Sequence, residues 1–179
     1  MPARKRSTSL EVLPSPAPWY EGGLRFQCTQ CGNCCSGPPG YVWLSDAEIS
    51  RFATHLNLTR EIFVRTYCRV VSGRISLREK KNLRNEFDCI FLAEREVDGK
   101  RHRGCTVYEV RPLQCRTWPF WDGLLQDSDS WNSAAVKCPG MNRGKHYTLD
   151  QIASLRDAAD WPDQAVTPGS AKKKNSTLE

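Results

Sequence analysis

The sequence predicts an α+β domain in which short helices and a minor β-hairpin pack around an irregular, cysteine-rich centre. Three observations predict it: helix-capping residues before apolar periodic segments, a short alternating stretch followed by a turn dipeptide, and nine cysteines gathered in a few segments. The 179 residues suit one domain, and 39% hydrophobic with 26% charged residues is the composition of an ordinary globular protein. Only the cysteine content is unusual.

Three helices are predicted from capping residues and apolar spacing. Ser45 with Glu48, and Thr148 with Gln151, form capping boxes that open the first and the third helix. Thr59 is the expected cap of the second helix. The residues expected to face the core are Ile49, Phe52, Ala53 and Leu56 in the first helix, Ile62, Phe63 and Tyr67 in the second, and Ile152, Leu155 and Ala159 in the third.

A short strand and a hairpin are predicted between the second and the third helix. Residues 74–78 alternate polar with apolar side chains, which is the pattern of a half-buried strand. Residues 94–104 contain the dipeptide Asp98-Gly99, which favours a type I′ hairpin turn. We expect this hairpin to return the chain on itself and to bring Cys89 and Cys105 close together.

The two ends of the chain differ in composition from its middle. Residues 1–23 and 162–179 are rich in Pro, Ser and charge, so we expect a flexible N-terminal segment and a flexible tail on either side of a domain over residues 24–161. No apolar stretch follows the basic N-terminus or reaches the length of a membrane span. We therefore expect a cytoplasmic protein without a membrane part, in which cysteines are metal ligands rather than disulfide partners.

The segment CxxCxxCC, formed by Cys28, Cys31, Cys34 and Cys35, is the most informative part of the sequence. A two-residue gap lets two thiolates converge on one metal, because the short loop turns back and its backbone amides point toward the sulfurs. Cys34 and Cys35 are neighbours in the chain and would ordinarily project in different directions. We therefore expect them to occupy different positions of a larger site, or two separate sites.

A second group of candidate ligands follows the hairpin. Cys105, Tyr108 and Cys115 have a spacing that would place them near one face of a helical turn, and Pro112 would break that helix or begin its next turn. The apolar residues 118–121 come next and can form a wall that excludes water.

The number of thiols suggests two sets of four. Cys68 has no cysteine near it in the sequence and is predicted to be a core residue of an amphipathic helix. Cys138 precedes Pro139, as in ferredoxin cluster motifs. Eight thiolates can form two four-thiolate zinc sites, two iron–sulfur clusters, or one cluster with one zinc. The three histidines lack ligand spacing to one another, and we expect them at the surface.

A basic segment lies within residues 60–84, which contain eight Lys or Arg and two Glu, in a chain with a formal charge of +6. Such a segment can attract nucleic acid, an acidic partner or an anionic substrate. No aromatic residues interleave with these charges in a stacking pattern, so a solvated face is favoured over nucleic-acid binding. Arginine beside a thiolate centre can also offset its negative charge.

The order of these motifs resembles the YkgJ-like cysteine-cluster family, described as "putative zinc- or iron-chelating" proteins. The resemblance covers about residues 26–150, and its matching segments are CxxCxxCC at residues 28–35, Cys89 with Phe91 and Leu92, the run from Cys105 through Tyr108, Arg111, Pro112, Cys115, Arg116 and Trp118 to Pro119, and Cys138-Pro139-Gly140. It implies a small, irregular, metal-centred domain. The ligands it implies are Cys28, Cys31, Cys34, Cys35, Cys89, Cys105, Cys115 and Cys138, holding iron–sulfur clusters or zinc.

Three functional hypotheses follow. The first is a metal-binding protein acting in redox or maturation chemistry. The flagellin lysine methylase is similar in its cysteine segment, which raises a second hypothesis of an iron–sulfur-dependent protein-modifying enzyme. The third is a zinc-stabilised adaptor that binds nucleic acid or an unidentified protein partner through the basic segment. Whether the chain is an enzyme stays open.

Overall fold

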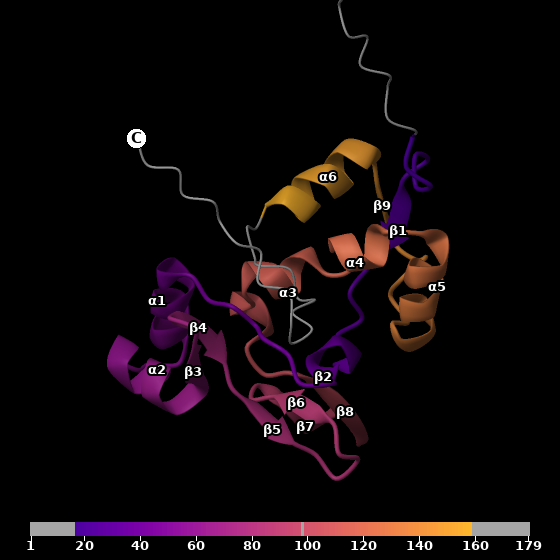
Figure 1. Cartoon of the computed structure of the whole chain (residues 1–179). Helices are drawn as coiled ribbons and strands as arrows, with labels where there is room; N and C mark the ends of the chain where they lie inside the picture. The colour runs from indigo at the N-terminus through magenta and orange to yellow at the C-terminus, as the bar shows by residue number, and fades with distance from the viewer. Residues whose placement is uncertain (1–16, 98, 159–179) are drawn as a thin grey trace, which may run out of the picture.

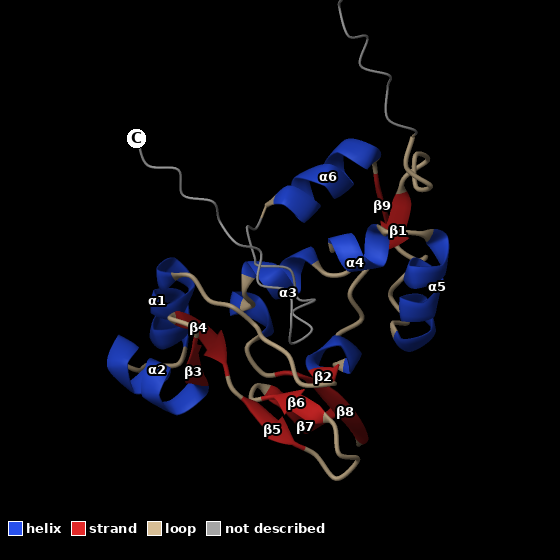
Figure 2. Ribbon diagram, viewed as in Figure 1, coloured by secondary structure: helices blue, strands red, loops and turns tan. Residues whose placement is uncertain are grey.

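The computed structural model describes residues 17–97 and 99–158, and it confirms the predicted α+β class. Figure 2 shows short helices and small antiparallel sheets joined by irregular loops. The predicted flexible tail and most of the N-terminal segment lie outside the described residues, as do Asp98 of the predicted hairpin turn and Ala159 of the third helix.

Short elements alternate along the chain. The helices are α1 (Asp46–His55), α2 (Arg60–Tyr67), α3 (Leu113–Thr117), α4 (Asp122–Leu125), α5 (Ser128–Lys137) and α6 (Leu149–Asp157), with 3-10 turns η1 (Asn33–Cys35) and η2 (Tyr108–Val110). The strands are β1 (Leu24–Phe26), β2 (Ser36–Gly37), β3 (Cys68–Val71), β4 (Arg74–Leu77), β5 (Glu79–Lys81), β6 (Phe87–Cys89), β7 (Leu92–Val97), β8 (Lys100–Cys105) and β9 (Lys145–Tyr147). They pair antiparallel as β1–β9, β2–β6–β5, β3–β4 and β7–β8.

The predicted caps open three of these helices. Ser45 Oγ accepts a hydrogen bond from the Glu48 backbone N–H at 3.3 Å, and the Glu48 carboxylate accepts one from the Ser45 N–H at 2.8 Å. Thr148 and Gln151 form the same reciprocal pair at the start of α6. Thr59 caps α2 through the Ile62 N–H. Each cap satisfies a backbone donor that a helix start leaves free, which is worth about 1 kcal/mol.

Other expectations were wrong in detail. Ile62 was expected to face the core, but it is 38% exposed, while its neighbour Phe63 is fully buried. Cys68 is a core residue as predicted, but it begins β3 rather than lying within a helix. The predicted strand over residues 74–78 and the hairpin over residues 94–104 appear as β4 and as β7–β8.

The interior consists of two separate hydrophobic cores. The α5–α6 core contains Tyr20, Leu24, Phe26, Phe120, Leu125, Trp131, Cys138, Met141 and Ile152. The α1–α2 core contains Ile49, Phe52, Ala53, Phe63, Cys68, Leu77, Phe91 and Val107, and stacks Phe52 on Phe63 with ring centroids 5.2 Å apart. In Figure 1 the elements of the two cores lie on opposite sides of a central region, below which β5–β8 extend.

Within residues 17–97 and 99–158, none of the helices combines the length and the apolar character that crossing a bilayer requires.

Candidate metal centre

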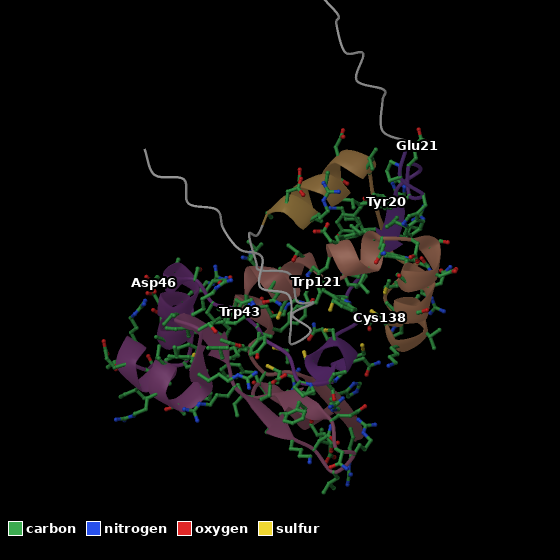
Figure 3. All side chains as sticks on the ribbon, in the orientation of Figure 1. Tyr20, Glu21, Trp43, Asp46, Trp121 and Cys138 are labelled. Atoms are coloured by element: carbon green, nitrogen blue, oxygen red, sulfur yellow. The ribbon has the colours of Figure 1, made fainter. Side chains whose placement is uncertain are left out.

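All eight predicted ligands line one small cavity of about 50 Å³. They are Cys28, Cys31, Cys34, Cys35, Cys89, Cys105, Cys115 and Cys138. Figure 3 shows sulfur atoms gathered in the middle of the molecule, in the region between the labelled Trp43, Trp121 and Cys138. The cavity lies where the two cores meet: Cys138 and Cys28 belong to or pack on the α5–α6 core, and Cys89 and Cys105 pack on the α1–α2 core.

The 3-10 turn η1 positions the CxxCxxCC segment. Gly32 precedes it with φ +74°, and the Cys35 N–H donates to the Gly32 carbonyl at 3.0 Å. A Cβ on Gly32 would lie 2.7 Å from Leu92 Cδ1 and 3.1 Å from the Arg103 carbonyl oxygen. Glycine is therefore required here both by the left-handed backbone and by the close approach of the β7–β8 hairpin.

The adjacent thiols of this turn differ from our expectation. Cys34 Sγ and Cys35 Sγ lie 3.9 Å apart and line the same cavity, so these side chains do not project in different directions. Thiolates that each lie about 2.3 Å from one tetrahedral zinc stand about 3.8 Å apart. The spacing of the two sulfurs is thus compatible with a shared ion, because the tight turn rotates both side chains to one side.

The β7–β8 hairpin brings Cys89 and Cys105 to the cavity, as the sequence predicted. Cys105 ends β8 opposite Leu92, and the Thr106 N–H donates to the Phe91 carbonyl at 2.9 Å. Cys89 ends β6, whose register places it opposite Glu79 of β5. Both cysteines therefore occupy strand ends, where the chain leaves the sheet and turns toward the thiols of η1.

Cys105, Tyr108 and Cys115 do not share a helix face, contrary to our prediction. They belong to β8, η2 and α3, because Val107 is not helical and Pro112 is extended at ψ 157° before α3 begins. The buried Gln114 anchors α3 by accepting from the Trp43 N–H at 2.9 Å and donating to the Tyr41 carbonyl at 3.0 Å. Cys115 is thus positioned by a neighbouring glutamine that spacing alone did not identify.

Arg111 places a positive charge beside the thiols. Its Nη1 lies 3.7 Å from Cys28 Sγ, its Nε donates to the Tyr108 carbonyl at 3.0 Å, and its guanidinium lies over the Tyr108 ring at 3.5 Å. The charge of Arg111 favours ionisation of Cys34, Cys105 and Cys115. The position of Arg111 in the cysteine motif did not by itself predict this role.

Burial and mutual repulsion raise the pKa values of four of these thiols. Burial raises the pKa of Cys89 to about 11 and raises the pKa values of Cys105 and Cys115 as well, and neighbouring cysteines add to each shift. The pKa of Cys35 is also raised. The hydrogen bond with Cys34 is the largest cause, and burial is the next largest. The same hydrogen bond lowers the pKa of Cys34 to about 7, against the opposing effect of burial. A bound cation would favour all the thiolate forms, so metal binding must release protons.

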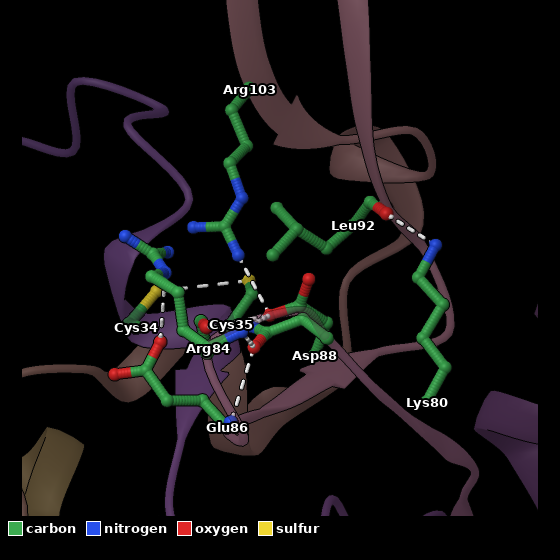
Figure 4. Close-up of polar contacts among 10 residues, drawn as sticks. Cys34, Cys35, Lys80, Arg84, Glu86, Asp88, Leu92 and Arg103 are labelled. Carbon is green, nitrogen blue, oxygen red and sulfur yellow. Dashed lines mark hydrogen bonds and ion pairs between the residues drawn. The ribbon is translucent and has the colours of Figure 1, made fainter.

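The buried carboxylate of Asp88 links β6, which ends at Cys89, to Ser36, the residue that follows Cys35. Asp88 Oδ1 accepts hydrogen bonds from Ser36 Oγ at 2.6 Å, Asn82 Nδ2 at 2.9 Å and Arg103 Nη2 at 2.7 Å. Figure 4 shows the ion pair of Asp88 with Arg103 beside Cys34 and Cys35. Burial acts to raise the pKa of Asp88, but these hydrogen bonds and the Arg103 charge outweigh it and hold the pKa below its ordinary value. Asp88 was not among the residues predicted from the sequence to belong to the site.

An open cleft of about 590 Å³ adjoins the cysteine cavity. Five cysteines line both spaces, namely Cys34, Cys35, Cys89, Cys115 and Cys138, together with Leu77 and Trp118. The walls of the cleft include Tyr41, Trp121 and Gly123. The apolar residues 118–121, which were expected to exclude water, therefore contribute two tryptophans to a space that is open to solvent.

The residues around the cavity fit a thiolate-bound metal in their chemistry, though not as a preformed set. Among the described residues, no three Cys, His, Asp or Glu side chains stand at positions that would hold one ion without moving. The donors are nonetheless eight soft thiols beside an arginine, which is the donor type of zinc and iron–sulfur sites. Trp118 lines the same cavity, and its indole Nε1 is buried without a hydrogen-bond partner in the described part of the chain. A thiolate or sulfide would be a natural acceptor for it.

The remaining candidates lie apart from this cavity. Cys68 is buried in the α1–α2 core, where burial raises its pKa to about 11. His55 lies on α1 and His102 on β8, and both are exposed, as is His146, which contacts the Gly22 carbonyl at 2.9 Å from β9. Cys68 is thus a core residue and the three histidines lie at the surface, as predicted.

Much of the basic segment is engaged within the molecule. Arg60 pairs with Asp46, Arg69 pairs with Glu79 at 2.7 Å, and Arg84 pairs with Glu86 at 3.3 Å. Arg78 donates to the backbone carbonyls of Cys68 and Arg65, and Arg74 lies over the Trp43 ring at 4.7 Å. These arginines therefore form intramolecular contacts, which account for their presence without a nucleic-acid partner.

Comparison with known proteins supports the family that the order of the motifs suggested. Residues 27–139 match the family described as "CxxCxxCC: Putative zinc- or iron-chelating domain". The chain belongs to this family. It is also similar to "Uncharacterized protein MJ0661" of Methanocaldococcus jannaschii, with 30% identity over 101 residues that cover 56% of this chain and 48% of the relative. The chain thus spans about half the length of that curated relative. No solved structure matches the chain.

Proposed function

We propose that the chain binds an iron–sulfur centre or zinc through its eight clustered cysteines and acts in redox or maturation chemistry. The observation that carries the proposal is the meeting of all eight thiols at one cavity, from segments as distant in sequence as Cys28 and Cys138. A cavity lined by so many thiols is not explained by packing alone, since aliphatic side chains would fill it at lower cost.

The openness of the site supports a functional rather than a purely structural metal. Structural zinc sites are closed by four protein ligands, whereas sites that do chemistry keep a side open. Here Cys34 is exposed, and a cleft adjoins the thiols. Eight thiols also exceed the four that one zinc or one iron–sulfur cluster requires, which favours two sites.

The residues around the proposed centre have distinct tasks. An iron–sulfur cluster would supply electron transfer there, and zinc would supply Lewis acidity. Arg111 offsets thiolate charge beside Cys28, and Trp118 offers an N–H donor to sulfur. Hydrogen bonds and charges of this kind tune the reduction potential and the ligand basicity of a thiolate centre.

Oxygen-free purification followed by elemental analysis and visible absorption tests the proposal. A brown protein with broad absorption identifies an iron–sulfur centre, and a colourless protein loaded with zinc identifies a zinc site. A well-folded product that contains neither metal and takes up neither on incubation would refute the proposal.

A protein-modifying, methylase-like activity is the second candidate, and the cleft beside the cysteines is the observation that favours it. Its volume of about 590 Å³ lies within the range of small-molecule sites. Equilibrium dialysis of the metal-loaded chain with S-adenosylmethionine, the general methyl donor, tests this candidate. Absence of saturable binding at millimolar concentration would remove it.

A further inference from the structure

Five cysteines line both the cysteine cavity and the cleft, and two of them, Cys34 and Cys35, belong to η1. Cys34 is exposed, whereas the other seven cavity cysteines are half-buried or buried. A ligand at this position can leave a metal without unpacking either core.

The cleft has the properties of a small-molecule site rather than a protein-docking face. It is concave, and aromatic side chains from Tyr41, Trp118 and Trp121 line it. Trp118 and five cysteines line both the cleft and the cysteine cavity, so a small molecule in the cleft would lie next to the thiols.

The chemistry of the centre selects the type of ligand. Zinc and iron bound by thiolates exchange most readily with another soft donor, and eight thiols exceed what one ion needs. We propose that the cleft admits a low-molecular-weight thiol that replaces Cys34 on the bound metal. This inference rests on the proposed function, and it adds a route and a ligand class by which the metal can be loaded or released.

The exchange step involves no oxidation. The sulfur of the incoming thiol forms a bond to the metal, and the bond between the metal and Cys34 Sγ breaks. The proton lost by the incoming thiol is taken up by the released Cys34 thiolate, directly or through water. The metal keeps its oxidation state, and the number of thiolates bound to it is unchanged.

Gly123 offers a direct test because it lines the cleft and has free space around it. A Cβ built on Gly123 meets nothing within 4 Å, so Gly123→Phe fills the cleft without a clash at its base. Gly22 is the matched control, since its Cβ also meets nothing within 4 Å and it lies outside the cleft. Ser133 is an exposed residue of α5 that also lines the cleft, so Ser133→Trp is a second substitution that should fill the cleft.

The assay follows transfer of the metal from the full, metal-loaded chain to a chromophoric chelator in the presence of 2-mercaptoethanol. We expect 2-mercaptoethanol to increase the rate of metal transfer up to a limiting value as its concentration rises. Gly123→Phe and Ser133→Trp should each reduce this rate increase at least tenfold, whereas Gly22→Phe should leave it unchanged. Ethylene glycol, which replaces the thiol by a hydroxyl, should not accelerate transfer. Equal acceleration in plugged and control proteins, or by ethylene glycol, would overturn the inference.

A second readout does not depend on metal. Limited alkylation of the full chain as purified, mapped by mass spectrometry, should modify Cys34 before the other cavity cysteines, and Gly123→Phe should slow that reaction. Modification of Cys89 or Cys115 ahead of Cys34 would overturn the inference. Failure of the proposed function would be distinguishable, because it appears as absence of metal in elemental analysis rather than as a change in these rates.

Discussion

Replacing Gly32 by alanine tests how the cysteine motif is held in place. Gly32 has φ +74°, where an L side chain costs roughly 1–2 kcal/mol. Its new Cβ would also lie 2.7 Å from Leu92 Cδ1 and 3.1 Å from the Arg103 carbonyl oxygen. Leu92 is 2% exposed and cannot move aside freely, so overpacking adds about 1–3 kcal/mol.

Gly73 provides the matched control for the backbone contribution. It has φ +77°, and its Cβ would meet nothing within 4 Å. Gly73→Ala should therefore lower the free energy of unfolding by roughly 1–2 kcal/mol, which is the cost of the left-handed conformation alone. Gly32→Ala should cost about twice as much or more, because contact with the hairpin adds to the same backbone cost.

Denaturant unfolding of the two metal-loaded variants, read by tryptophan fluorescence, measures the difference. Gly32→Ala should also hold less metal, because the displaced turn carries Cys34 and Cys35. Equal destabilisation by the two substitutions, with full metal content in both, would refute the reasoning that packing against the β7–β8 hairpin fixes the position of η1.

Three further predictions concern the thiols and their surroundings. Cys115→Ala should lower the metal content measured by elemental analysis, whereas Cys68→Ala should destabilise the fold and leave the metal content unchanged; an equal loss of metal in both would contradict the assignment. Arg111→Met should weaken metal affinity on the order of tenfold in a chelator competition, with Arg111→Lys in between; unchanged affinity would exclude a role for its charge. Because the pKa of Asp88 is lowered in the fold, its stabilisation is present above its unfolded pKa of about 4 and is lost as pH falls through the folded pKa. The stability difference between the wild type and Asp88→Asn, measured by denaturant unfolding, should therefore shrink below about pH 4, and a difference that stays constant would argue against the ion pair.

Local signals in the sequence predicted local structure well. The capping boxes at Ser45 and Thr148 were recognisable because both partners lie within one helical turn. The strand and hairpin between α2 and α3 were likewise recognisable from alternation over a few residues. The spacing of the cysteines and their family resemblance selected the eight that line the cavity, because metal-ligand motifs are read from short gaps.

Features that depend on distant segments were not predictable in this way. Asp88 receives hydrogen bonds from Ser36 and Arg103, which are 52 and 15 residues away, so no local pattern marks it. The direction of the Cys34 and Cys35 thiols depends on η1, whose shape follows from Gly32 packing against the hairpin. The cleft is formed by side chains from η1, β5, α4 and α5, and its existence depends on how those elements dock.

The position of the cavity gives the proposed metal a physical role in holding the molecule together. The two hydrophobic cores are separate clusters, and each contributes cysteines to the space between them. Bonds from one metal centre to Cys138 on one side and to Cys89 on the other would join cores that apolar contact does not merge. The free energy of metal binding would then be part of the free energy of folding. Because that centre would border the open cleft through Cys34, an external ligand could reach the metal there without disturbing the bonds to Cys89 and Cys138 that join the cores.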